Sequence, residues 1–370
     1  LPLYALITMS IGLPWARVLL APVERGSRAL LLAVAIPAGF ALITAWLLLL
    51  GTLAAFMGEP LVRPVPIAVG AAGLSVAGVL LALRSHGVRR APLTLRADER
   101  LLIRLIALAV TTAALVTAYW SVTAYDALWV YGYQGRLYAL TGAIPHSIDY
   151  YPQFMPLLYA LGQLDGINDH TARAVVPLLH IGAILAAYAL GRLIDNRRTG
   201  VVLAALWALY PHVGEWSRAG DLEIPLTLSF TLASAFFLRA WLRAGSGSAG
   251  WRRDAVLAGL AFGVALWTKP TAGAFALGVA LMGMIAVAQA YVRHRTPGAV
   301  WQAVRLRFAT ALITALACAP LGGVWYVRNL ALGHSAVDFP PPFWQTLAER
   351  GGDDFGFPLL ALGLCLGFVW

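Results

Sequence analysis

The sequence predicts an all-α protein, a polytopic transmembrane helical bundle of about eleven spans. Three observations lead to this fold class. The chain is 60% hydrophobic and only 12% charged, whereas a soluble domain carries about 25% charged residues. Apolar runs long enough to cross a bilayer recur along its whole length, since a helical span needs about 20 such residues. Clusters of arginine alternate with these runs.

The apolar runs define the candidate spans in order. They lie at residues 1–16, 29–57, 65–83, 101–120, 171–191, 199–212, 222–242, 254–268, 271–291, 308–327 and 357–370. Each is read as a helix because a bilayer leaves no partner for backbone polar groups outside the segment itself.

Arginine clusters set the orientation. If every run crosses once, the clusters within 17–28, 84–104, 192–198, 239–253 and 293–307 all fall on one side. Because cytoplasmic loops carry an excess of basic residues, that side is predicted to be cytoplasmic. This accounts for the net charge of +10 without a nucleic-acid partner. It places the chain as a multi-pass protein in the cell membrane (plasma or inner), in contact with membrane lipids.

The longest complete loop, 121–170, is predicted on the outer face. Its apolar segment 152–164 would reach only about 18 Å as a helix, too short for about 30 Å of hydrocarbon. Counting it as a span would also move the later arginine clusters outside. We therefore expect two interfacial helices in this loop, the first one ended by Gly142 and Pro145.

Polar residues gather where the predicted spans emerge on the outer face. Taken singly they have ordinary explanations: surface ion pairs of little worth, snorkelling cations or an aromatic belt. Their convergence on one face favours a functional site, because charges at a membrane boundary must be paired or solvated. The candidates are Asp126, His146, Asp149, Tyr151, Glu215, Arg218, Asp221, Lys269, Arg328 and Asn329.

Lys269 is the single lysine among 27 basic residues, and Pro270 follows it. Proline suits the first turn of a helix, so two spans are expected to meet in a tight outer hairpin there. A lysine at such a helix start either anchors the hairpin by snorkelling or binds an anion. We favour the anion.

Several segments together resemble the GT-C glycosyltransferases. They are the loop that begins at Asp126, "YYPQFMPLLYALGQL", "HTARAVVPLLHIGAILAAYALGRL", "GLAFGVALWTKPTAG" and "PLGGVWYVRNLALG". The resemblance covers about 101–335 and is to the bacterial protein O-mannosyltransferases and the lipid-A aminoarabinose transferases. It implies an N-terminal transmembrane extension at 1–100 (about three spans) and a catalytic domain at 101–370, which we expect to be truncated at its C-terminus.

The family resemblance also implies a reaction. A sugar would pass from a polyprenyl-phosphate donor to an acceptor hydroxyl, on a lipid, a glycan or a protein, at the outer face. Asp126 matches the family's catalytic aspartate of the first loop. A carboxylate can take the acceptor's proton, and a single displacement would invert the anomeric carbon. Lys269 and Arg328 would hold the donor phosphate.

The remaining candidates would position sugar or acceptor. Many members of the family have an acidic pair at the first-loop position, where this chain has a single acid, Asp126. We therefore expect no metal ligands and no required cofactor, although a divalent metal stays open.

Three other functions compete with this one. A transporter would place charges inside the spans and show inverted repeats, whereas the middles of these spans are almost free of charge. An O-antigen ligase or polymerase would place its functional loop late in the chain. A non-catalytic scaffold explains the topology and leaves the outer acids unused.

Overall fold

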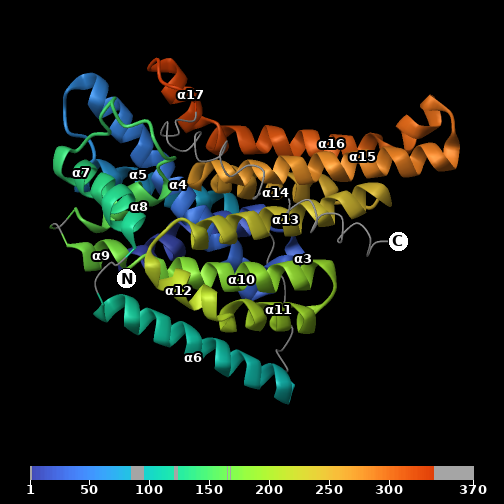
Figure 1. Ribbon diagram of the computed structural model, residues 1–370, viewed down its shortest axis with the longest axis horizontal. Coiled ribbons are helices and arrows are strands. Elements are labelled where there is room, and N and C mark those ends of the chain that lie inside the picture. Colours follow the sequence, from blue (N-terminus) through green and yellow to red (C-terminus); the bar gives the residue numbers. More distant parts are fainter. Residues whose placement is uncertain (1, 85–95, 121–123, 165, 167, 337–370) are drawn as a thin grey trace, which may run out of the picture.

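The computed structural model describes residues 2–84, 96–120, 124–164, 166 and 168–336 (Figure 1). Within these ranges every regular element is a helix, which confirms the predicted all-α class. The chain begins with α1 (Pro2–Ile7), the π-helix η1 (Thr8–Gly12), α2 (Leu13–Leu19), α3 (Pro22–Arg25), α4 (Arg28–Met57), α5 (Pro64–Leu83) and α6 (Ala97–Tyr119).

Short helices then precede the second set of long ones. They are the π-helix η2 (Ala127–Gly132), α7 (Tyr133–Thr141), α8 (Phe154–Gly162) and α9 (Asp169–Arg173). The rest are α10 (Val176–Ile194), α11 (Arg197–Leu209), α12 (Pro211–Ala219), α13 (Glu223–Gly245), α14 (Trp251–Thr268), the 3-10 helix η3 (Pro270–Gly273), α15 (Ala274–His294), α16 (Pro297–Gly322) and α17 (Val324–Ala331).

Eight helical segments in the described part are long and apolar enough to cross a membrane, so this is a multi-pass membrane protein. They are Pro2–Leu19, Arg28–Met57, Pro64–Leu83, Ala97–Tyr119, His170–Ile194, Glu223–Gly245, Pro270–His294 and Pro297–Gly322.

Three of the predicted spans do not join this set, and the count of eleven stays a prediction. Residues 199–212 fall on α11, whose 13 residues reach only about 20 Å at 1.5 Å per residue. Residues 254–268 fall on α14, which has 18 residues but begins with Trp-Arg-Arg-Asp. Residues 357–370 lie outside the described part of the chain.

Helix α4 lies at the centre of the bundle, because it is the helix most deeply buried among the candidate spans. Trp267 on α14 donates from its indole nitrogen to Thr44 Oγ1 of α4 (3.2 Å). Tyr4 on α1 donates to the carbonyl of Leu158 on α8 (2.8 Å). Residues between Tyr4 and Ile67 therefore share one hydrophobic core with the rest of the described chain, and the predicted domain boundary near residue 100 stays a prediction.

Glycines bring α14 against α16. A Cβ on Gly259 would lie 2.3 Å from the carbonyl oxygen of Thr314, and one on Gly263 would lie 2.9 Å from that of Cys318. Small residues four apart let helix backbones approach in this way. The contact fixes the relative direction of α14 and α16, and so the positions of their last residues, Thr268 and Gly322, at the end of the bundle.

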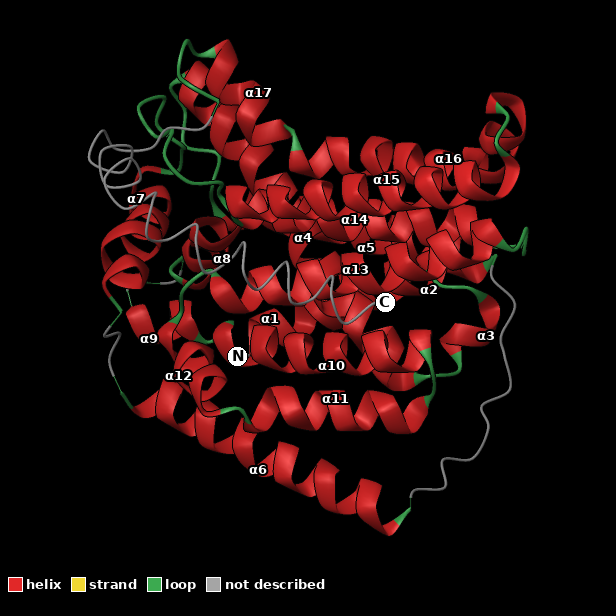
Figure 2. Cartoon of the chain, turned by 45° about the vertical axis from the view of Figure 1, so that its right-hand side comes forward, coloured by secondary structure: helices red, strands yellow, loops and turns green. Residues whose placement is uncertain are grey.

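The bundle has two chemically different ends (Figures 1 and 2). The short helices η2, α7, α8, α9, α12 and α17 gather at one end, which we call the carboxylate end. The basic loops within 17–28, 192–198, 239–253 and 293–307 lie at the opposite end, the arginine end. These are the two sets that the sequence assigns to opposite sides of the membrane.

One predicted interfacial helix has different surroundings from those expected. Helix α8 corresponds to the apolar segment 152–164 and, with nine residues, is too short to be a candidate span. Its residues 154–161 are all buried in the protein. The segment is apolar because α8 packs against α7 and α4, not because one of its faces meets lipid headgroups.

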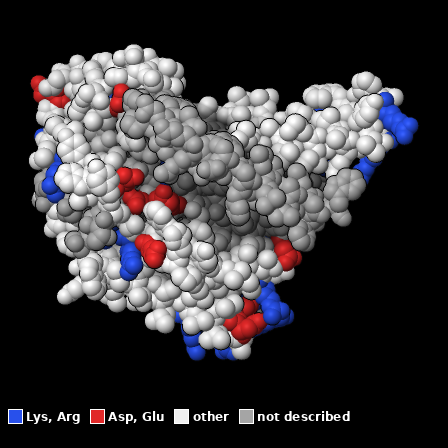
Figure 3. All heavy atoms as spheres, viewed as in Figure 1, with Lys and Arg blue, Asp and Glu red and all other residues white. Residues whose placement is uncertain are grey.

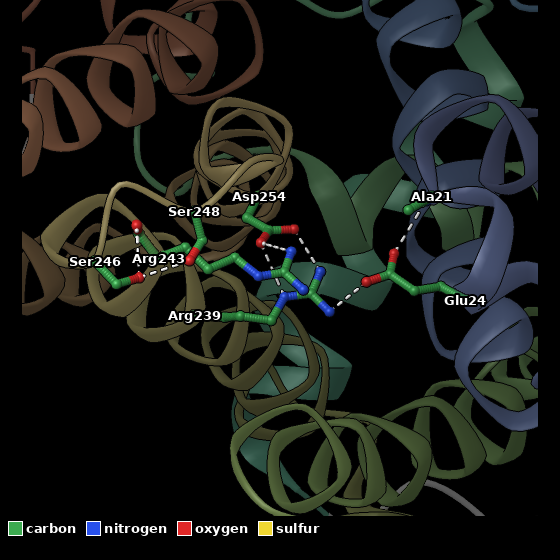
Figure 4. A network of polar contacts seen from close by, with 7 residues as sticks. All are labelled: Ala21, Glu24, Arg239, Arg243, Ser246, Ser248 and Asp254. Atoms are coloured by element: carbon green, nitrogen blue, oxygen red, sulfur yellow. Dashed lines mark hydrogen bonds and ion pairs between the residues drawn. The ribbon is translucent and has the colours of Figure 1, made fainter.

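A buried ion-pair network closes the arginine end (Figure 4). Arg239 on α13 pairs with Glu24 of α3 and with Asp254 of α14. Arg243 donates to the second oxygen of Asp254 (2.7 Å). The backbone N–H of Ala21 donates to Glu24 Oε2 (3.0 Å). Two carboxylates thus meet two guanidinium groups, and three helices are joined.

Candidate active site

Asp126 stands at the start of a π-helix. It is the N-cap residue of η2, and no side-chain cap bond holds its carboxylate. Asp126 is exposed, whereas the next residue, Ala127, is buried. π-helical turns are rare and occur often at functional sites. The predicted interfacial helix is thus η2 followed by α7, and Gly142 ends it in the left-handed conformation (φ 73°), as the sequence predicts.

The turn after α12 brings a second carboxylate to Asp126. Gly220 ends α12 with φ 82°, a conformation that favours glycine. Tyr159 donates from its hydroxyl to the Gly220 carbonyl, and a Cβ on Gly220 would lie 2.6 Å from that hydroxyl. Asp221 follows Gly220 directly and comes near the start of η2, since the charge of Asp126 and the N–H of Ala127 both act on its pKa. The two outer loops therefore meet behind Asp126.

Asp221 has a perturbed acidity. Burial raises the pKa of its carboxyl group to about 6, and the negative charges of Glu223 and Asp126 act in the same direction. Lys269 and the Ala127 N–H oppose them. Its Oδ1 atom is buried and has no hydrogen-bond partner in the described part of the chain. A partly buried carboxyl group with a raised pKa, at the edge of a bundle, indicates a candidate functional site.

Lys269 lies in the same group of charges. Its Nζ atom is 3.0 Å from Glu223 Oε1, and both side chains are partly exposed. Lys269 is the C-cap of α14 and Pro270 begins η3, so the tight hairpin that the sequence predicts is present. An ammonium group has three donors, and Glu223 accepts from one of them. The remaining two can meet an anion.

Two tyrosines border these charges. The rings of Tyr131 and Tyr151 lie edge to face, with centroids 5.7 Å apart. Burial raises the pKa of both hydroxyls, and the charges of Asp126 and Glu223 raise it further. Gln153 donates to the carbonyl of Tyr151 (2.5 Å) and so fixes the backbone at this residue. The tyrosines offer ring surface beside the carboxylates.

The sequence-based site omits two members of this group, Tyr131 and Glu223. Tyr131 lies in the first helix predicted in the outer loop, where a tyrosine is typical of an aromatic belt at the membrane interface. Glu223 lies in the first turn of α13. The sequence could have identified Glu223, because it lies close to the outer Asp221 at a predicted helix N-terminus, which favours negative charge.

The surface reflects this arrangement (Figure 3). Acidic atoms gather on the left and centre of the view, around α8, α12 and the start of α13, and basic atoms lie beside them on the left. Basic atoms also lie at the far right tip, where α15 meets α16, and together with acidic atoms at the lower rim. The acidic group at centre-left lies over the carboxylate end of the bundle.

Arg328 and Asn329 belong to a second cluster. Arg328 donates to the carbonyls of Pro145 (3.1 Å) and Ile148 (2.9 Å), and its guanidinium lies over the Trp325 ring (4.6 Å). Asn329 donates to the carbonyl of Asp149 (2.8 Å). Burial lowers the pKa of Arg328. Helix α17 therefore holds the 145–149 turn.

The two clusters are electrostatically distinct. The charges that act on Arg328 are those of Tyr138 and Asp149, and none of the charges that act on Asp221 belongs to this set. The carboxylate of Asp149 pairs with His334 (3.1 Å). The structure therefore places Asp149, Arg328 and Asn329 beside the Asp126 group, not within it.

Three further candidates stand on the surface. The His146 ring packs on Phe56 (centroids 4.7 Å apart). Glu215 forms an exposed pair with His212 (3.3 Å), an arrangement that contributes little to stability. Arg218 is exposed on α12. The structure does not bring these three into contact with Asp126 or Asp221.

Metal ligation has no evident site in the described residues, where no three His, Cys, Asp or Glu side chains are grouped so that they could hold an ion. Cys318 is a buried free thiol, and Cys365 lies outside the described residues.

Residues 151–325 match the family described as dolichyl-phosphate-mannose-protein mannosyltransferase. This match indicates the class of protein, a membrane glycosyltransferase of the GT-C type. The match confirms the resemblance seen in the sequence. It includes Asp221, Glu223 and Lys269, while Asp126 and Arg328 lie outside it. No curated protein and no solved structure gives a significant match.

Proposed function

We propose that this protein transfers a sugar from a polyprenyl-phosphate donor to an acceptor hydroxyl, at the outer face of the cell membrane and with inversion at the anomeric carbon. The observation that carries the proposal is the convergence of Asp126, Asp221, Glu223 and Lys269 at one end of the bundle. Three of these four residues lie within the matched family domain.

The donor class follows from the family. Its description names a dolichyl-phosphate-linked mannose and a protein acceptor, and its members use polyprenyl-phosphate-linked donors. For this chain we propose the lipid-phosphate donor and a hydroxyl acceptor, and leave the sugar open. The matched domain supports this over a ligase, a transporter or a scaffold.

The chemistry assigns Asp126 as the base. Its exposed carboxylate can be reached by an acceptor, whose hydroxyl proton it takes as the oxygen attacks the anomeric carbon. The bond from that carbon to the phosphate oxygen breaks, and the polyprenyl phosphate leaves with the electron pair. Lys269 stabilises the charge on the leaving phosphate through its two remaining donors.

Other residues prepare the site. Asp221 lies near the Ala127 N–H, which lowers the pKa of its carboxyl group, and we assign it the role of positioning the backbone that carries Asp126. Tyr131 and Tyr151 provide ring surface on which a sugar can stack. No cofactor enters the scheme.

Arg328 receives a different role from the one predicted. Two of its nitrogens already bind the carbonyls of the 145–149 turn. We therefore propose that Arg328 and Asn329 position this turn, and with it Tyr151, while Lys269 meets the phosphate.

The test is sugar transfer by the Asp126→Asn variant. Membranes with the full chain are assayed with a panel of polyprenyl-phosphate sugars. Loss of a general base lowers turnover by about 10²–10⁴-fold, with membrane insertion unchanged. Glu215→Gln is the matched control, since it removes an outer carboxylate outside the cluster. Full activity of Asp126→Asn would rule out Asp126 as the base.

A further inference from the structure

An apolar groove lies between α13, α15 and α16, away from the candidate active site. Its volume is about 640 Å³, and Trp241, Gly283, Met284, Tyr291 and Phe308 are among the residues that line it. This is within the usual size range of ligand-binding pockets.

The groove exists because α15 and α13 are in contact near the start of α15 and diverge toward its end. Near the start of α15, Phe275 packs against Phe237 of α13 (centroids 5.5 Å apart) and Phe262 of α14 (4.6 Å apart). Further along, α15 packs on α16 instead. Trp241 and Tyr291 lie in the last turns of α13 and α15. The groove therefore extends from the middle of the bundle to the arginine end.

A cation stands at this end of the groove. The guanidinium of Arg307 lies over the Trp241 ring (5.9 Å). It also lies against the backbone of Gly245, where a Cβ would come within 2.6 Å of Nη2. Its Nε atom is buried and has no hydrogen-bond partner among the described residues. The side chain as a whole is only partly buried, so its positive charge can act on an anion at the adjacent end of the groove.

The surrounding hairpin adds positive charge. Arg293, Arg295 and Arg305 lie on it, and residues 270–337 contain no aspartate or glutamate. The groove is apolar along its length and ends at aromatic rings and at arginines without a nearby acid in the sequence. It therefore matches a ligand with an apolar chain and an anionic head.

We propose that this groove binds an anionic phospholipid. One acyl chain lies along Gly283, Met284 and Phe308, and the phosphate meets Arg307 beside Trp241 and Tyr291. Basic pockets between transmembrane helices bind anionic headgroups in this manner. The site is at the opposite end from Asp126 and Lys269, so it stands independently of the proposed function.

The experiment measures lipid binding by the purified full chain. Native mass spectrometry in detergent compares phosphatidylglycerol with phosphatidylcholine of the same acyl chains. We expect the anionic lipid to bind about fivefold more tightly, the factor that one arginine near an anionic headgroup provides. Arg307→Gln should abolish this preference, while Arg305→Gln, an equal change of charge on the same helix, should retain it.

The apolar part is tested by filling the groove. A Cβ at Gly283 or at Gly278 meets no atom within 4 Å, so leucine fits at both positions of α15. Gly283 lines the groove and Gly278 does not. Gly283→Leu should lose bound phosphatidylglycerol, and Gly278→Leu should keep it.

Several outcomes would overturn the proposal. Among them are equal binding of the two lipids, equal loss in the two glycine variants, an unchanged preference in Arg307→Gln, and displacement of the lipid by inorganic phosphate at constant ionic strength. The last would identify a simple phosphate site. Displacement by polyprenyl phosphate at equal concentration would likewise contradict the proposal, because the groove would then be a donor site.

Discussion

The two ends of the bundle handle buried charge in opposite ways. At the arginine end, Glu24 and Asp254 meet Arg239 and Arg243, and both carboxylates are bonded. At the carboxylate end, within the described residues, Lys269 pairs with Glu223 alone, the charges of Asp126 and Glu223 both act on Asp221, and Asp221 keeps a buried oxygen without a partner. Buried charges that are paired with opposite charges hold helices together. An excess of buried negative charge lowers stability, and it is retained where the chemistry of a site needs it.

The sharpest way to break the balanced end is Arg239→Met. It leaves Glu24 without its ion-pair partner and Asp254 with only Arg243, and we expect about 3–5 kcal/mol of lost stability. Thermal and denaturant unfolding in detergent measure it. Arg198→Met is the matched control, since it breaks the exposed Arg198–Asp98 pair (3.1 Å). Equal, small effects of both variants would show that the buried network contributes little.

The opposite sign is expected for Asp221→Asn. In the folded protein the pKa of Asp221 is about 6, above its ordinary value of 3.8. Its ionised form is therefore disfavoured by folding, and stability is lost as pH rises from about 4 to about 6. The variant removes this loss and should be more stable at pH 7 by about 1–3 kcal/mol, while transfer falls.

Unfolding temperatures of wild type and Asp221→Asn between pH 4 and 8 test this. The two curves should converge at the acid end. A variant that is less stable than wild type at every pH would mean that Asp221 is a structural residue like Asp254.

Lys269 sharpens the comparison further. Lys269→Ala removes the single cation of the cluster and should raise the KM for the donor by about tenfold, the effect of losing one charge-assisted contact. Because Lys269 lowers the pKa of Asp221, the variant should also raise the pKa of this carboxyl group, which the pH dependence of the unfolding temperature would show. Lys269→Arg shows whether charge alone suffices. An unchanged KM in Lys269→Ala would leave the lysine as a hairpin anchor.

The smallest effect is expected from chelation. Excess carboxylates could be neutralised by a divalent cation, but we propose that Lys269 serves this purpose. EDTA treatment of purified enzyme should therefore leave sugar transfer within experimental error. Loss of activity that Mg²⁺ or Mn²⁺ restores would contradict the cofactor-free scheme.

Much of this architecture could be predicted from the sequence, because apolar length and arginine position are strong signals. They give the helical class and the grouping of Asp126, Asp221 and Lys269 at one end. The approach of Asp221 to Ala127 could not be predicted, since it depends on the left-handed turn at Gly220 and on the position of Tyr159.

Arg328 illustrates a second limit. Its partners are backbone carbonyls about 180 residues earlier in the chain, and no side-chain pattern in the sequence identifies carbonyl acceptors. Helix α8 shows a third limit, because an apolar run of nine residues is the same whether protein or lipid surrounds it. The apolar run predicts that these residues avoid water, and only the packing of the folded chain decides whether protein or lipid covers them.

Gly220 has a consequence for reading loss-of-function variants. A single methyl group there would push on the Tyr159 hydroxyl, disturb its hydrogen bond to the Gly220 carbonyl and displace the turn that carries Asp221. Gly220→Ala would therefore look like a catalytic lesion in any selection for activity, although it changes no charge and lies outside every chemical step. A loss-of-function variant at Gly220 would indicate that the site residues are displaced, while one at Asp126 would indicate that the base is missing.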